Sequence, residues 1–370
     1  MSSDVLFQQA MQRALVHFLS ANARVRRWSD RLKTGPLRTA FDAVGRSVTV
    51  PDAMPAGVYA QALAVLAGDW SRAAARENGE WVPTGRPYAD WLRDGGAHER
   101  FAPVRALQEY ATEHRDLLAR AVVHGSVGTL DDVPGFSDMD VAFVVREEAL
   151  GDPDALLELR RLAQHAYGTT LRFDPFMHHE PLFIGEPLLR GYPQSLFPTV
   201  LFATALDLIA PRPLHVTSLG AADHGTDDLF GVFRSFFSEL PVPLRLGSWY
   251  DGEWVLGNAM ILPALYLQAR DGVYRYKRET FTLARPHFTE AEWAPIEVAS
   301  RVRASAPPRP APPRLLVTGA SAWRRPELVR TWAIRGRASR RHATVAGAGV
   351  PADFGPRTVA LIDAMRERLG

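Results

Sequence analysis

Two short apolar runs near the middle of the chain carry residues whose types and spacing fit phosphate chemistry. The first run, residues 122–124, is followed by Gly125-Ser126, and Asp138 and Asp140 open the second. Successive side chains of a strand point to opposite faces, so both aspartates would lie on one face, about 7 Å apart. Two carboxylates in this arrangement repel each other unless a cation lies between them. The pattern therefore predicts a site for a hard cation such as Mg²⁺, which binds carboxylate oxygen and usually keeps a substrate phosphate in its shell.

The Gly-Ser turn complements this acidic pair. Glycine lets the backbone approach a phosphate closely, and the free N–H groups of a turn form a nest for an anion. We therefore expect Gly125 and Ser126 to bind the phosphates of a nucleotide whose cation is held by Asp138 and Asp140.

These residues also carry a family resemblance. The Gly125-Ser126 turn, a loop, and Ser137-Asp138-x-Asp140 resemble the signature of the DNA polymerase β-like nucleotidyltransferase superfamily. They are nearest in style to its small-molecule branch, such as the kanamycin and streptomycin nucleotidyltransferases. The resemblance implies an α+β fold, in which a small mixed β-sheet core is flanked by helical N-terminal and C-terminal regions.

Two departures from the family pattern are visible. His124 stands where the family usually has an apolar or aromatic residue, and the loop is slightly long and carries Asp131 and Asp132. Neither departure removes a catalytic group, but both leave the substrate class open.

The resemblance implies further site residues. The family has a third carboxylate on a strand after the helix that follows Asp-x-Asp, and Asp174 matches that place because residues 169–176 alternate in polarity. Asp174 would complete a second metal site or act as a general base, with Asp207 and Glu180 as rivals for this position. A lysine at the start of a late helix reaches the nucleotide phosphates in this family, and Lys277 has a similar place and context.

The implied reaction is attack of an acceptor oxygen on the α-phosphorus of an NTP, with release of pyrophosphate. Mg²⁺ would be the cofactor and ATP the expected co-substrate. A small-molecule acceptor is the preferred partner. Transfer to RNA or to a protein side chain is one alternative, and a nucleotide-binding regulator without turnover is another.

Composition sets outer limits on the class of protein. The 370 residues are 46% hydrophobic, which is enough for two or three domains with cores of their own. The absence of cysteine excludes disulfides, thiolate metal sites and cysteine nucleophiles, and it fits a reducing cytoplasm. The N-terminus shows no signal-peptide pattern, and the longest apolar run, near Thr199 to Ala210, is too short to span a bilayer. We expect a cytoplasmic protein without a membrane partner.

The elements that must position these residues follow from the pattern of apolar residues. Residues 1–100 are expected to form a helical region, 101–220 the nucleotidyltransferase core, 221–305 a second helical domain, and 306–370 a proline-rich linker with an arginine-rich segment. Within the core, Asp152 and the proline after it predict the start of a helix that ends near residue 168.

Two remaining features allow more than one interpretation. His178 and His179 are adjacent, and on a strand they would point to opposite faces, so a structural or substrate-side role is favoured over a zinc site. The arginine-rich stretch 323–342 has the composition of an RNA-binding segment, but its apolar spacing favours a partly packed helix. Nucleic acid is therefore a less favoured partner, and an oligomer is compatible with the sequence.

Overall fold

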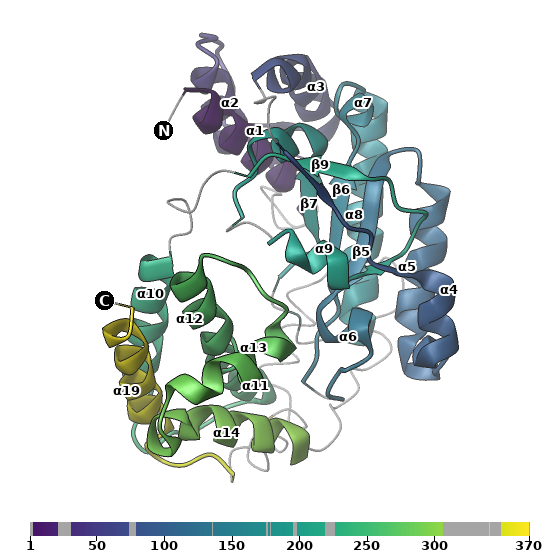
Figure 1. Ribbon diagram of the computed structural model, residues 1–370. Helices are drawn as coiled ribbons and strands as arrows, with labels where there is room; N and C mark the ends of the chain where they lie inside the picture. The colour runs from purple at the N-terminus through teal and green to yellow at the C-terminus, as the bar shows by residue number, and fades with distance from the viewer. Residues whose placement is uncertain are drawn as a thin grey trace.

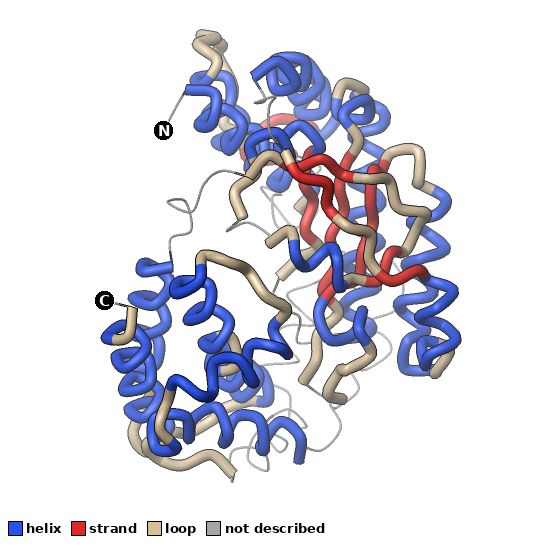
Figure 2. Tube along the Cα trace, viewed as in Figure 1, coloured by secondary structure: helices blue, strands red, loops and turns tan. Residues whose placement is uncertain are grey.

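The computed structural model describes residues 3–20, 31–73, 79–134, 136–174, 177, 179–194, 198–218, 226–305, 340 and 349–369. The fold is α+β with a small mixed sheet, as the sequence predicts. Figure 2 shows that the strands are confined to one half of the molecule and that the other half is helical. Within the described residues, no helix is long and apolar enough to cross a membrane.

The central sheet has five strands in the order β4-β8-β5-β6-β7. Their bounds are β4 Arg86–Pro87, β5 Leu118–His124, β6 Asp140–Val145, β7 Leu182–Gly185 and β8 Leu206–Asp207. The antiparallel pair β5 and β6 lies in the middle, with His124 opposite Asp140, and β7 runs parallel to β6. All residues of β5 before His124 are buried, and they include Arg120, whose guanidinium is paired with Asp207 of β8.

Helices that come before the strands of the central sheet in the sequence, and helices that lie between these strands, share one hydrophobic core with the sheet. They are α1 Ser3–Leu19, α2 Gly35–Ala43, α3 Ala56–Ala73, α4 Tyr88–Trp91, α5 Ala102–Glu113, α6 Gly125–Thr129, α7 Glu147–Leu150, α8 Pro153–Phe173 and α9 Val200–Thr204. Helix α8 contacts α3 and α5, and Figure 1 shows α5 and α8 alongside the sheet. Residues from Phe7 to Val216 form one buried cluster, so the N-terminal region packs as part of the core. Two small ribbons, β1 Arg31–Lys33 with β2 Ala53–Pro55 and β3 Glu80–Val82 with β9 Leu214–Val216, complete this half.

A side chain of α1 forms hydrogen bonds with the backbone of the edge strand β7. Gln12 Nε2 donates to the Phe183 carbonyl, and the Gly185 N–H donates to Gln12 Oε1 at 3.0 Å. Gln12 is buried, and its amide satisfies the Phe183 carbonyl and the Gly185 N–H, which have no neighbouring strand on this edge of the sheet. This contact ties α1 to the strand that follows the candidate site.

Helix α8 corrects one expectation. Its start is as predicted, because Asp152 accepts a hydrogen bond from the Asp154 N–H and Pro153 occupies the first turn. The helix then continues to Phe173, so the strand predicted from residue 169 is wrong; residues 175 and 176 lie outside the described residues. The β-branched Thr170 is satisfied within the helix, where its hydroxyl donates to the Tyr167 carbonyl at 2.9 Å.

A second hydrophobic cluster builds the helical half. Its elements are α10 Thr226–Ser238, α11 Trp249–Ala259, α12 Leu262–Asp271, α13 Lys277–Ala284, α14 Glu290–Ser305 and α19 Phe354–Glu367. Helix α19 lies in the segment expected to hold only a linker and an arginine-rich tail, and it packs against α10 and α14 (Figure 1). The arginine-rich stretch itself lies outside the described residues apart from Arg340.

The loop between Gly-Ser and Asp-x-Asp joins the two halves. Phe136 belongs to the helical cluster, with its ring centroid 5.0 Å from that of Trp249. The Tyr276 hydroxyl donates to Asp131 Oδ1 at 3.0 Å, and Asp132 accepts from Arg100 at 2.9 Å. Asp131 and Asp132 therefore hold the loop in position through these hydrogen bonds, and they do not join Asp138 and Asp140 in one acidic group.

Candidate active site

The acidic pair lies where β6 begins. Asp140 is the first residue of the strand, and Asp138 lies two residues before it. Gly125 follows β5 with φ of +68°, a conformation that L-residues with side chains rarely adopt. A Cβ at this position would lie 3.2 Å from Asp140 Oδ2. Glycine at this position thus fits both the positive φ of the turn and the close approach of the Asp140 carboxylate.

Ser126 is engaged with the other end of the motif. Its Oγ lies 2.9 Å from Ser137 Oγ, and Ser137 Oγ also accepts the Val133 N–H at 2.8 Å. The contact between Ser126 and Ser137 therefore holds the two ends of the loop between them close together. This contact keeps the Gly-Ser turn next to the acidic pair.

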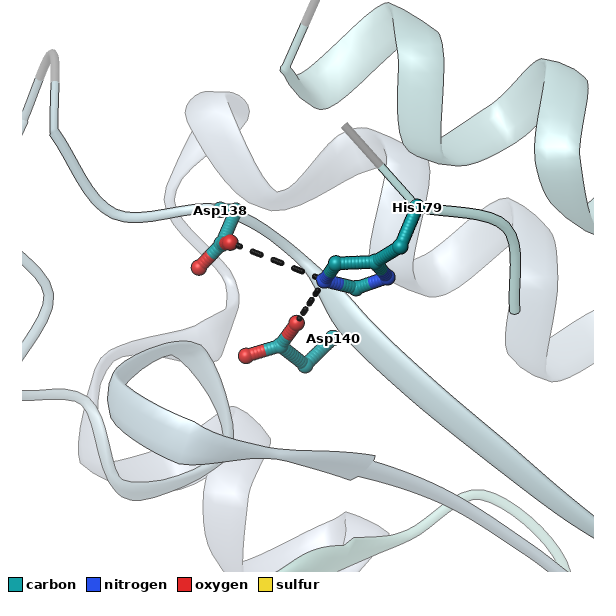
Figure 3. Close-up of side chains that lie close together, drawn as sticks. All are labelled: Asp138, Asp140 and His179. Atoms are coloured by element: carbon teal, nitrogen blue, oxygen red, sulfur yellow. Dashed lines mark ion pairs between the residues drawn. The ribbon is translucent and has the colours of Figure 1, made fainter. Parts of the chain in front are cut away.

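His179 completes a group of three potential metal ligands. One ligand atom from each of Asp138, Asp140 and His179 lies within 4.8 Å of the others. Figure 3 shows both carboxylates directed at the same ring nitrogen; His179 Nε2 is 2.9 Å from Asp140 Oδ1 and 3.8 Å from Asp138 Oδ2. Burial by itself lowers the pKa of His179, but the hydrogen bond and charge of Asp140, with the charge of Asp138, raise that pKa to about 9. At neutral pH the His179 side chain is therefore an imidazolium, and its positive charge offsets the repulsion between the carboxylates of Asp138 and Asp140.

A cavity of about 240 Å³ lies between the acidic pair and the helical half. Its charged and titratable lining residues are Asp138, Asp140, His179, Glu253, Lys277 and Arg303. Lys277 is the first residue of α13, as the resemblance implies for the late lysine. Burial and the charge of Arg303 lower the pKa of Lys277 to about 8, against the opposing effect of the two aspartates.

The expected third carboxylate lies elsewhere. Asp174 follows the last residue of α8, is 1% exposed, and its N–H donates to the Thr170 carbonyl at 2.7 Å. Among the described residues, it is not a member of the ligand group. Its rival Asp207 forms a buried ion pair with Arg120 at 2.8 Å on the neighbouring strand, which assigns it a structural role.

The donor set fits a divalent cation. Two carboxylates and one imidazole offer three ligand atoms that converge from a strand end and a loop. The cations Lys277 and Arg303 line the same cavity, so a ligand that carries both a metal ion and negative charge matches the site. Of these five residues, the sequence analysis anticipated the aspartates and Lys277.

His179 and Arg303 were missed for different reasons. The histidine was interpreted as part of a strand, whereas β7 begins only at Leu182, so the rule of alternating faces does not apply to it. Arg303 lies in α14 and is one arginine among many, and its place beside the site depends on tertiary packing over Phe136, 5.4 Å from that ring centroid.

No protein-family model matches this chain, and comparisons with curated proteins and with solved structures give no match either. Inferences about function therefore rest on the site and on the resemblance carried by its motif.

Proposed function

We propose that this protein is a divalent-cation-dependent nucleotidyltransferase that moves an NMP, in preference AMP, from an NTP to an oxygen of a small-molecule acceptor. One observation carries the proposal. The Asp-x-Asp pair and Lys277, which are far apart in the sequence, line the same cavity. A fortuitous Asp-x-Asp would have no reason to face a lysine at the start of a late helix.

Each of these residues has a role in the proposed reaction. Asp138 and Asp140 would hold the cation, which when bound neutralises phosphate charge and polarises the phosphoryl oxygens. Gly125, which lies beside Asp140, and Ser126, which follows it, would contact the phosphates. Lys277, with Arg303, would face the pyrophosphate, where negative charge develops as it leaves.

The chemical step is a substitution at the α-phosphorus. A bond forms between the acceptor oxygen and the α-phosphorus, and the bond from this phosphorus to the oxygen that bridges to the β-phosphorus breaks. The electron pair of that bond leaves with pyrophosphate, and the acceptor hydroxyl releases its proton. Positioning and electrostatic stabilisation then account for most of the catalysis.

The test is calorimetric titration with α,β-methylene ATP, with and without Mg²⁺ or Mn²⁺. We expect binding that requires the metal and is abolished in Asp138→Asn. Asp90→Asn, which changes an exposed pair with Arg93, is the matched control and should bind as the wild type does. Pyrophosphate release from ATP with pools of hydroxyl compounds then identifies the acceptor. Nucleotide binding that ignores both the metal and Asp138, or no binding of any NTP analogue, would refute the proposal.

A further inference from the structure

The third member of the ligand group is an imidazole in place of the carboxylate that the resemblance implies. Asp174, the expected third ligand, is buried at the end of α8 outside the group. His179 instead brings Nε2 to 2.9 Å from Asp140 and 3.8 Å from Asp138. The site therefore offers two oxygens and one nitrogen, and this difference has chemical consequences.

The orientation of the ring suits coordination through Nε2. His179 Nδ1 lies 3.3 Å from the backbone carbonyl oxygen of Glu180. Nε2, the nitrogen on the side of the two carboxylates (Figure 3), gives up its proton when a metal ion takes the place of the ion pair, while a proton kept on Nδ1 donates to the Glu180 oxygen. Metal-bound histidines commonly have this outer contact, which fixes both the tautomer and the ring orientation.

An imidazole ligand changes which cation a site prefers. Mg²⁺ requires a near-octahedral shell of oxygen ligands, whereas imidazole nitrogen favours first-row transition ions. Two carboxylates and the phosphates of a nucleotide remain hard oxygen donors, which Mn²⁺ accepts together with a nitrogen. Mn²⁺, which shares the oxygen-ligand preference of Mg²⁺ and is itself a first-row transition ion, therefore matches this mixed donor set better than Mg²⁺ does.

We propose that His179 is the third ligand of the cation site and shifts its preference from Mg²⁺ toward Mn²⁺. This inference rests on the proposed function, because it concerns the cation that Asp138 and Asp140 would hold. It replaces the expected acidic triad with a mixed site, and it makes His179 a metal ligand rather than a structural residue.

The experiment is a Mn²⁺ titration of the metal-free protein followed by electron paramagnetic resonance, with Mg²⁺ as competitor. Pulsed measurements on bound Mn²⁺ should show coupling to a directly bound ¹⁴N nucleus. His179→Gln should remove this coupling. His179→Asp, which restores a carboxylate, should lower the preference for Mn²⁺ over Mg²⁺ by about tenfold.

A second histidine provides the matched control. His124 ends β5 opposite Asp140, so it is a second imidazole near the site. His124→Gln should keep the ¹⁴N coupling, and circular dichroism of each variant reports whether it is folded.

The outcomes separate the two proposals. If the wild type binds no Mn²⁺, or binds it equally well after Asp138→Asn, the proposed function fails. If Mn²⁺ binding requires Asp138 but the ¹⁴N coupling is absent, or survives His179→Gln, the proposed function stands and the role of His179 is overturned. An unchanged metal preference in a folded His179→Asp would also overturn it.

Discussion

Gly125 is the residue at which the backbone turn and the acidic pair constrain each other. Its φ of +68° costs a residue with a side chain roughly 1–2 kcal/mol. A Cβ would also lie 3.2 Å from Asp140 Oδ2, so that carboxylate would have to move by a few tenths of an ångström. We predict that Gly125→Ala lowers the free energy of unfolding by about 1–2 kcal/mol. It should also weaken Mn²⁺ binding roughly tenfold, because Asp140 leaves its place beside the other ligands.

Gly272 separates these two effects. It ends α12 with φ of +67°, nearly the same φ as that of Gly125, and a Cβ there would meet nothing within 4 Å. Gly272→Ala should therefore reproduce the loss of stability and leave Mn²⁺ affinity unchanged. Urea unfolding gives the first quantity, and titration of free Mn²⁺ gives the second. Wild-type affinity in a folded Gly125→Ala would refute the reasoning, as would an equal loss of affinity in Gly272→Ala.

Two further predictions concern charge. Asp207→Asn removes one partner of the buried pair with Arg120, so it should lower the free energy of unfolding, measured in urea, by about 3–5 kcal/mol. Asp90→Asn, in the exposed pair with Arg93, should lower it by about 1 kcal/mol or less. Similar losses in the two variants would contradict the structural role of Asp207. The pKa of His179, about 9, lies above its usual 6.5, so in metal-free protein its ion pair contributes stability that is fully present below pH 6.5 and is lost as the pH rises through 9. The difference in Tm between the wild type and His179→Gln should shrink over that window, and a difference independent of pH would argue against the ion pair.

The local parts of the site were predictable because each is set by a short stretch of chain. The apolar residues 121–123 of β5, the glycine that follows the strand and the apolar run 141–145 of β6 indicate a strand, a turn and a second strand without reference to distant residues. The end of α12 at Asp271 follows from Gly272, which takes a left-handed conformation, whereas the start of α13 at Lys277 was implied by the resemblance.

The contacts that complete the site were not predictable in this way. Residues 169–173 alternate in polarity as a strand does, yet they continue α8 because burial against α3 and α5 outweighs the weak local preference of threonine for strands. Asp174 follows this helix directly and is not in the ligand group found among the described residues. The loop that follows then brings His179 to the acidic pair, and no periodicity in the sequence describes a loop.

Phe136 has a consequence for how this protein can be divided. It lies two residues before Asp138, yet its ring packs among the helices of the other half, against Trp249 and Arg303. A chain that stopped after residue 218 would keep its sheet but would expose this ring to water and release the loop that positions the acidic pair. The strand end that carries the acidic pair is therefore not a transferable module, and recombination between distant relatives would have to exchange both halves together.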